Sequence, residues 1–450
     1  AMRRSLFAAA SVIALAAAPA FAQENDDEDE VVVDDTREEP VETATVDDGA
    51  PANLVIGANG RVQINNQSGP AVRVNSNNDL TLENGGRIGV SDLDADGEDL
   101  DLDGAVGVQV DPGVEADIEN GGVIGLVDTY LAQPTEDDVD VDGDGEPDTE
   151  DPEADGPFAR DTNKTGLLVG AVDDQFDPVA GQAPLTGSIT HTSSGSIRVA
   201  GQDSFGLRTV TDVTGDILLA GSVSMRGERS RAISLEGDVG GDVSVDNVDL
   251  IAPDGDGVAV EGDVGGNIRF TGRLNVSGYR VNQRVSAAFV EQLESEDLQD
   301  AGAAIIIAGN VAGGVFFSED ASLTHLSSSA GVSIGDGGRT VNIGPASLPD
   351  DFLAVPGEED EDEDRELFDH AILNQGSLRA DGLYDGRSST AFLIGGIDDQ
   401  GRIRAVILGG DGLRNEGLIQ STAYDASATS LRFGDGAQAE ALSNSGQIIA

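Results

Sequence analysis

The sequence predicts an all-β protein, a parallel β-helix or β-solenoid with acidic loop insertions. Residues 233–245, 258–270 and 305–317 repeat one phrase, which reads ISLEGDVGGDVSV, VAVEGDVGGNIRF and IIIAGNVAGGVFF. Apolar residues occupy alternate positions of each copy, which is the period of a β-strand. Glycine and valine are too frequent in these copies for a helix. The hand of the coil is not encoded in this pattern, and we take it as right-handed.

The interval between the copies predicts stacked coils. Aligning residues 207–219 with the three copies places Val213, Val239, Val264 and Val311 at one position. The last interval is about twice the first two, as expected if one rung intervenes. Strands of a β-sandwich do not repeat one phrase at a fixed interval. Rungs of about 22 residues over roughly 400 residues would give about 18 rungs.

A second phrase, apolar-x-Asn-x-Gly-x-apolar, occurs five times. Asparagine and glycine adopt positive φ more readily than other residues, so we expect these pairs to turn the chain between short strands. The asparagines are Asn84, Asn120, Asn374, Asn415 and Asn444, and the glycines are Gly86, Gly122, Gly376, Gly417 and Gly446.

The order of segments along the chain predicts export. Residues 1–22 read as a signal peptide, with Arg3 and Arg4, an apolar run, and a small-residue cleavage site that ends at Ala22. Residues 23–51 read as an acidic disordered linker. We expect the solenoid to occupy residues 52–450, with acidic insertions at about 126–165 and 346–368. Residues 284–300 are the one helix-compatible stretch.

Composition restricts the partners. The chain has 84 acidic and 25 basic residues, a net charge of −59, no cysteine, and a single lysine, Lys164. Such a charge opposes binding to nucleic acid and to anionic lipid. Without cysteine, an exported domain has no disulfides to stabilise it.

The sharpest chemical motif is a calcium loop at residues 140–151 (DVDGDGEPDTED), which follows the Asp-x-Asp-x-Asp-Gly spacing. Alternate positions of a tight loop point inward and supply the oxygen ligands that Ca²⁺ prefers. A weaker copy lies at residues 92–104. The predicted metal ligands are Asp140, Asp142, Asp144, Asp148 and Asp151, and, in the weaker copy, Asp92, Asp94, Asp96 and Asp103.

Catalytic signals are weak. His191, His325 and His370 are the only histidines and are too scattered to form a catalytic set or a zinc site. Carboxylates are so abundant that a pair of them carries little information. We therefore predict that the protein is not an enzyme.

The signal peptide, the Asn-x-Gly turns and the GDVGGDV rungs resemble the passenger regions of autotransporters, the type V secreted proteins of Gram-negative bacteria. Residues 276–317 and 383–437 are similar to large alphaproteobacterial autotransporter-domain proteins. The resemblance implies a surface-displayed or secreted passenger and, as partner, an outer-membrane barrel of the same longer chain. We expect the sequence to continue beyond Ala450 into that barrel.

The resemblance and the regular rod imply a structural or adhesive stalk that contacts host cells, neighbouring cells or a polysaccharide surface. Two alternatives remain open. Parallel β-helices also host polysaccharide lyases and glycosidases, which need paired carboxylates or Ca²⁺. A surface-layer-like coat protein would also be acidic.

Overall fold

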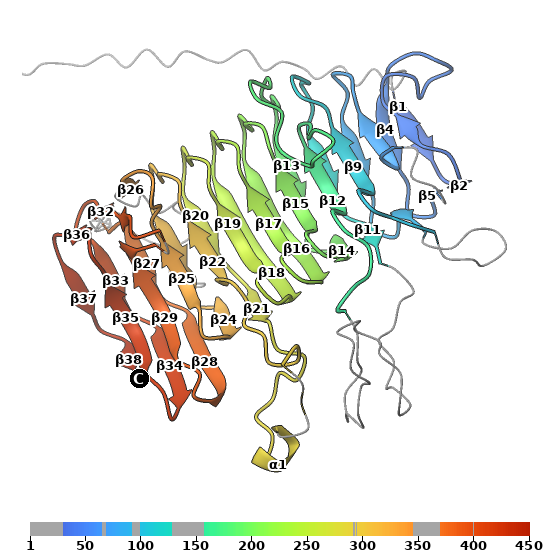
Figure 1. The fold of residues 1–450 in the computed structure, drawn as a ribbon. Coiled ribbons are helices and arrows are strands. Elements are labelled where there is room, and N and C mark those ends of the chain that lie inside the picture. Colours follow the sequence, from blue (N-terminus) through green and yellow to red (C-terminus); the bar gives the residue numbers. More distant parts are fainter. Residues whose placement is uncertain are drawn as a thin grey trace, which may run out of the picture.

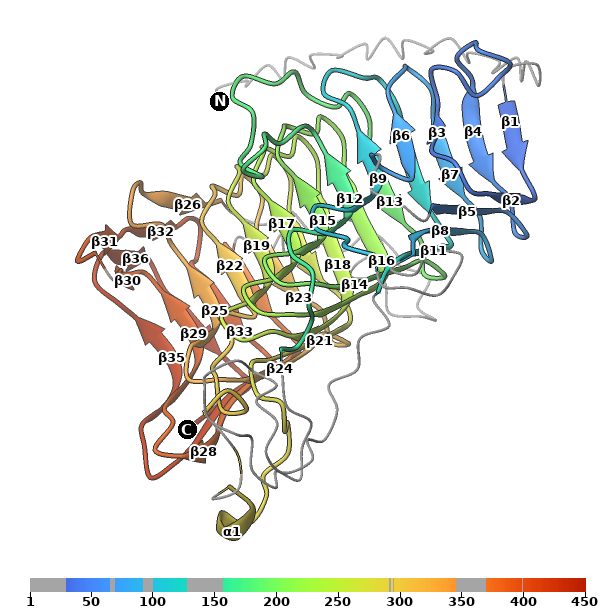
Figure 2. The same ribbon diagram turned by 45° about the vertical axis from the view of Figure 1, so that its right-hand side comes forward.

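The computed structural model describes residues 30–64, 69–91, 100–127, 157–290, 293, 295–344, 370–398 and 400–450. In this part of the chain the architecture is a parallel β-solenoid, as predicted, whose rungs follow one another in chain order (Figure 1). Each rung carries up to three main strands, and each strand pairs in parallel with its counterpart in the next rung. The three columns of strands enclose one elongated core. Figure 2 shows the ribbon from a second side.

Strands that begin a rung form the first column: β1 (Glu30–Val33), β4 (Asn53–Ile56), β7 (Leu80–Leu82), β10 (Ile118–Asn120), β13 (Ile189–His191), the first part of β16 (Ile217–Arg226), the first part of β18 (Val243–Ile251), β20 (Ile268–Phe270), β23 (Val315–Phe317), β27 (Ile372–Asn374), β33 (Leu413–Asn415) and β37 (Leu442–Asn444).

The second column follows each of these after a short turn: β2 (Thr36–Arg37), β5 (Arg61–Ile64), β8 (Arg87–Val90), β11 (Val123–Leu126), β14 (Ser196–Ala200), the second parts of β16 and β18, β21 (Arg273–Ser277), β24 (Ser322–Leu326), β28 (Ser377–Asp385), β34 (Leu418–Tyr424) and β38 (Gln447–Ile449). Because β16 and β18 run through both columns, the two columns form one 22-stranded sheet.

The third column is a separate 11-stranded sheet: β3 (Val41–Glu42), β6 (Val72–Val74), β9 (Val106–Val110), β12 (Thr165–Val169), β15 (Phe205–Thr209), β17 (Arg231–Leu235), β19 (Asp256–Val260), β22 (Ile305–Ile307), β25 (Ala330–Ile334), β29 (Ser389–Ile394) and β35 (Ala428–Phe433). Later rungs add a short parallel sheet of β26 (Val341–Ile343), β32 (Val406–Leu408) and β36 (Ala437–Ala439), and an antiparallel hairpin of β30 (Gly396–Ile397) and β31 (Ile403–Arg404).

The valine alignment is confirmed. Parallel bridges join Val213 to Val239, Val239 to Val264, and Val264 to Val311, and the same column continues to Ile343. However, Val264 and Val311 lie on adjacent rungs, so the long interval is one rung with an inserted segment rather than two periods. The first column holds twelve strands in the described residues, fewer than the 18 rungs predicted, because such insertions lengthen individual rungs.

The predicted linker boundary is wrong. Strands β1, β2 and β3 lie within residues 23–51 and pair with β4, β5 and β6 of the next rung. The reason is the run Val31–Val33, which pairs in register with Leu54–Ile56. Three consecutive β-branched residues form a strand when a partner edge is present, in spite of acidic neighbours.

The core is one hydrophobic cluster that extends from Val33 in the first rung to Ile419 near the last. Residues at equal positions of successive rungs stack upon one another. Phe270 and Phe317 occupy adjacent positions of the first column, and their rings stack 5.0 Å apart with 13° between the planes. Each rung therefore buries its apolar face against its neighbours, as in other repeat proteins.

The asparagines do not turn the chain through positive φ, contrary to the prediction. Asn120, Asn374, Asn415 and Asn444 end strands of the first column, and none has positive φ. Asn374 donates from Nδ2 to Oδ1 of Asn415 at 2.6 Å, and Asn415 donates to Oδ1 of Asn444 at 2.7 Å. Asn84 differs, because it lies in an exposed turn after β7. The repeated asparagines therefore form a ladder of hydrogen bonds from one rung to the next.

The glycine of each phrase is required because the backbone of the preceding rung leaves no room for a side chain. A Cβ on Gly417 would lie 2.0 Å from the carbonyl oxygen of Gly376, and one on Gly446 would lie 2.1 Å from that of Gly417. Neither glycine has positive φ. The glycine thus permits close backbone contact between successive rungs rather than an unusual turn.

The aspartates of the repeated Gly-Asp-Val phrase form a second ladder of hydrogen bonds between rungs. The backbone N–H of Asp238 donates to Oδ1 of Asp212 at 2.9 Å, and that of Asp263 donates to Oδ1 of Asp238 at 2.8 Å. Asn310 continues the ladder with its N–H on Oδ1 of Asp263 at 2.9 Å. The repeated phrase has a second position held by Asp or Asn, and it forms the same kind of bond: the N–H of Asn267 donates to Oδ1 of Asp242 at 2.7 Å. Each side chain therefore satisfies a backbone donor of the next rung.

A lateral lobe departs from the solenoid between β21 and β22. Its short helix α1 (Ala287–Val290) lies at the tip, inside the stretch predicted to be helix-compatible (Figure 1). Tyr279, Leu383 and Tyr384 form a small second core at its base. The guanidinium of Arg387 pairs with Asp300 at 2.8 Å and holds the lobe against the rung that carries β28.

Candidate functional site

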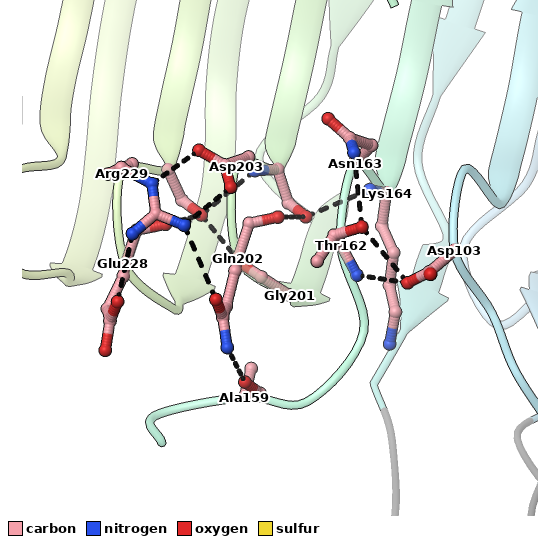
Figure 3. A network of polar contacts seen from close by, with 12 residues as sticks. Asp103, Ala159, Thr162, Asn163, Lys164, Gly201, Gln202, Asp203, Glu228 and Arg229 are labelled. Carbon is pink, nitrogen blue, oxygen red and sulfur yellow. Dashed lines mark hydrogen bonds and ion pairs between the residues drawn. The ribbon is translucent and has the colours of Figure 1, made fainter. Parts of the chain in front are cut away.

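A polar corner lies where the chain enters the third column, and Figure 3 shows its side chains. Asn163, Asp203, Arg229 and Asp254 hold the same place in four successive rungs, and each has a φ between 49° and 58°. An αL residue at this place turns each rung into its third strand. Here the positive-φ turn predicted for the asparagine motif occurs, but at a different position.

Serines support this corner from inside. The backbone N–H of Lys164 donates to Oγ of Ser204 at 2.9 Å, and the N–H of Ser204 donates to Oγ of Ser230 at 3.1 Å. Both serines are buried. On the outside, Arg229 donates from Nε and Nη2 to the two carboxylate oxygens of Asp203, each at 2.7 Å. This arrangement fixes the backbone of the corner.

Lys164 is the unusual member of the corner. Its side chain is fully buried, and Nζ lies 2.7 Å from Oδ2 of Asp161, whose side chain is 16% exposed. Asp161 lies close to Asp101 and Asp103, since the three residues offer carboxylate oxygens within 4.8 Å of one another. An ammonium and three carboxylates therefore meet beside the start of β12.

Asp103 is the one predicted metal ligand that the structure describes. Asp92, Asp94, Asp96, Asp140, Asp142, Asp144, Asp148 and Asp151 all lie outside the described residues. The neighbours of Asp103 in the cluster were not predicted, because Asp161 is 58 positions away in the sequence and reaches Asp103 only through the stacking of rungs.

The described carboxylates alone fit Ca²⁺ poorly. Oδ1 of Asp103 accepts the N–H and the hydroxyl of Thr162 at 2.7 and 3.1 Å, and Oδ1 of Asp101 accepts the N–H of Asp103 at 2.9 Å. Oδ2 of Asp161 faces the Lys164 ammonium. Calcium takes six to eight oxygens. Three partly engaged carboxylates beside a fixed cation do not supply them.

The three histidines, His191, His325 and His370, belong to three different rungs. His191 is buried, and Nδ1 lies 3.0 Å from Nδ2 of Asn120. Burial lowers the pKa of His191. His325 lies in another rung, with Nε2 2.9 Å from the carbonyl oxygen of Gly302. Burial lowers the pKa of His325 to about 4, so both rings are neutral at pH 7.

An open groove of about 690 Å³ crosses the outer surface of the third column beside the β30–β31 hairpin. Its lining includes Asp256, Ser333, Asp398 and Arg404. Oδ1 of Asp256 accepts the N–H of Ala303 at 3.0 Å. The carboxylate of Asp398 accepts the backbone N–H of Arg402 at 2.7 Å and its Nε at 2.6 Å. Both carboxylates thus also hold the backbone in place.

Among the described residues, no helix is long and apolar enough to cross a membrane. Comparisons with protein-family models, with curated proteins and with solved structures find no match to this chain.

Proposed function

We propose that the chain is the exported passenger of an autotransporter and acts as a structural or adhesive stalk at the surface of a Gram-negative cell. The observation that carries this proposal is the stack of twelve parallel rungs that the described residues form around one elongated core. Such a stack is a stiff spacer whose length grows by about 4.8 Å per rung. Its turns and the lateral lobe offer contact surfaces away from the core.

The charge supports a role at a cell surface. A net charge of −59 keeps a long rod soluble and separate from other copies. It also opposes binding to polyanions, so the partner surface is a neutral or cationic one. The absence of cysteine suits a chain that is exported unfolded and folds outside the cell.

The proposal is tested on intact cells that carry the complete gene. Antibody against the solenoid should label intact cells, and external protease should remove that label. Cells without the gene should adhere less to their target surface. Labelling only after permeabilisation, together with unchanged adhesion, would show that the proposal is wrong.

A matched pair of deletions separates a stalk from a fixed site. Removing residues 239–263 joins Asp238 to Val264 and deletes one repeat in register, because Val239 and Val264 are equivalent. A stalk should tolerate this change and remain displayed. Removing residues 239–262 instead puts Asp263 at the valine position, and a slip of one residue exposes inward side chains. This control should lose display.

The second candidate, a glycosidase or lyase, is favoured by the groove. Burial raises the pKa of Asp256 although Arg231 opposes it, and the backbone N–H of Arg402 lowers the pKa of Asp398. Carboxyl groups with opposite shifts are a pattern of acid–base pairs. Incubation with polysaccharides should release reducing ends or unsaturated sugars if this candidate is right, and Asp256→Asn should abolish the release.

Calcium binding by Asp140, Asp142, Asp144, Asp148 and Asp151 remains a proposal that rests on the spacing around Gly145. Five carboxylates in one loop repel each other, and a divalent cation relieves that repulsion. Titration calorimetry should show an affinity on the order of 10⁻⁴ to 10⁻³ M. The Asp142→Ala, Asp144→Ala double variant should lose this binding. Unchanged stoichiometry and affinity would show the assignment to be wrong.

A further inference from the structure

The chain contains three Asn-Gly dipeptides, Asn59-Gly60, Asn84-Gly85 and Asn120-Gly121. Such a dipeptide is prone to deamidation, because the backbone nitrogen of the glycine can close a five-membered ring onto the asparagine amide and no Cβ blocks its approach. The reaction needs an accessible amide and a backbone N–H that can lose its proton. Since the three dipeptides are chemically identical, differences between them come from the fold.

The turn that carries Asn84 leaves both reacting groups open. Residues 83–86 form a β-turn, which the N–H of Gly86 closes by donating to the carbonyl oxygen of Glu83 at 2.9 Å. Asn84 and Gly85 are its central residues, and Gly85 has the positive φ, 102°, that the third residue of a type II turn requires. Both central residues are exposed. Among the residues that the structure describes, neither the Asn84 amide nor the N–H of Gly85 has a hydrogen-bond partner.

The same four letters, Glu-Asn-Gly-Gly, recur in the next rung but fold differently. Asn120 is 4% exposed, its Nδ2 lies 3.0 Å from Nδ1 of His191, and its Oδ1 accepts the N–H of Gly122 at 3.1 Å. The N–H of Gly121 donates to the carbonyl oxygen of Leu82 at 2.6 Å. In this copy both the amide and the attacking nitrogen are therefore engaged.

Asn59 is exposed, but the nitrogen that would attack it is engaged. The N–H of Gly60 donates to the carbonyl oxygen of Gly57 at 2.8 Å, and Gly60 is buried. Here the glycine of the dipeptide is the donor that closes the turn, one place later than at residues 83–86. A hydrogen-bonded amide within a packed rung reaches solvent only when the structure opens locally. The position of the dipeptide within its turn thus decides whether the nitrogen is free.

We propose that Asn84 deamidates spontaneously in the folded protein, whereas Asn59 and Asn120 are protected by the hydrogen bond of the following glycine. Solvent base removes the proton of the Gly85 nitrogen, which attacks Cγ of Asn84 and forms the N–Cγ bond. The Cγ–Nδ2 bond breaks, and the nitrogen takes a proton from water and leaves as ammonia. Water then opens the cyclic imide, at Cγ to give aspartate or at the main-chain carbonyl to give isoaspartate. One water is consumed and one ammonia is released, with no other reactant.

The two products affect the rung differently. Aspartate adds a negative charge to an exposed turn. Isoaspartate also carries the main chain through Cβ, which lengthens a turn whose two ends are fixed. The N–H of Glu83 is held by the carbonyl oxygen of Ile56 at 2.9 Å, and that of Arg87 is held by Gly60 at 3.1 Å. Isoaspartate should therefore loosen the start of β8. The inference goes beyond the proposed function and does not depend on it.

The test is peptide mapping of the full chain after incubation in buffer, once folded and once in urea. Trypsin releases residues 74–87, in which tandem mass spectrometry locates a change at Asn84, and the other two asparagines lie in other peptides. In the folded chain, conversion at Asn84 should exceed that at Asn59 and Asn120 by about tenfold or more, since the latter require local opening. Aspartate and isoaspartate peptides should both appear as separate chromatographic peaks. In urea the three rates should become similar.

Two variants serve as controls. Asn84→Gln keeps an exposed amide in the same turn, but its longer side chain cannot close the five-membered ring, so this residue should remain unchanged. Asn84→Asp is the standard that identifies the aspartate peak. Equal rates at the three sites in the folded chain would overturn the proposal. So would an Asn84 that stays intact in the folded chain over an incubation that converts it in urea.

Discussion

Replacing Val264 by Asp should be far more damaging than changing its neighbour Asp263, because the two side chains lie on opposite sides of the rung. Val264 is 2% exposed and stands between Val239 and Val311 in the valine column. A carboxylate there would have only apolar neighbours above and below. An unpaired buried charge costs about 3 to 5 kcal/mol.

Two substitutions at Asp263 serve as controls, and they differ in the interactions that they remove. Oδ1 of Asp263 accepts the N–H of Asn310, and Arg339 lies 2.8 Å away. Asp263→Asn keeps an acceptor and loses an exposed ion pair, which is worth about 0 to 1 kcal/mol. Asp263→Ala also leaves the N–H of Asn310 without its acceptor, at a cost of about 1 to 3 kcal/mol.

The assay is urea unfolding followed by circular dichroism, with hydrogen exchange read over residues 258–270. Because a repeat protein can unfold in parts, local exchange shows whether the loss begins in this rung. Val264→Ala is the variant most certain to fold and should cost about 2 kcal/mol through its lost methyl groups. Equal shifts for Val264→Asp and Asp263→Asn would refute the assignment of inner and outer faces.

Three further predictions concern the ladders and the buried histidine. Asn415→Ala, which removes hydrogen bonds on both sides of a buried residue, should destabilise by about 2 to 3 kcal/mol, and Asn415→Asp should not rescue it. Gly417→Ala should lower the urea midpoint more than Gly125→Ala, since an added Cβ at Gly125 meets nothing within 4 Å and its φ is not positive. The pKa of His325 is about 4 when folded and near 6.5 when unfolded, so stability should fall as the pH drops from about 6.5 to 4, by about 3 kcal/mol in all. His325→Gln should remove that pH dependence in thermal unfolding.

The ladders show how a sequence pattern can be right in position and wrong in cause. Asn374 and Asn415 recur at one place of a rung, and that recurrence was visible in the sequence. Their hydrogen bonds run to the next rung, 41 residues away, and no local rule contains that contact. The conformational preference of asparagine predicted a turn with positive φ. In the stacked rungs its side chain instead donates a hydrogen bond to one neighbouring rung and accepts one from the other.

The sequence by itself determined the fold class, because a strand period repeated at a fixed interval can bury its apolar face only by stacking. It also determined the valine column, since equivalent residues of successive rungs must coincide. Tertiary structure decided what each inserted segment does to the spacing, and it brought Asp161 to Asp101 and Asp103. Those contacts depend on which rungs are neighbours in space. A loop inserted between two rungs changes how far apart their residues lie in the sequence, but it leaves the two rungs adjacent.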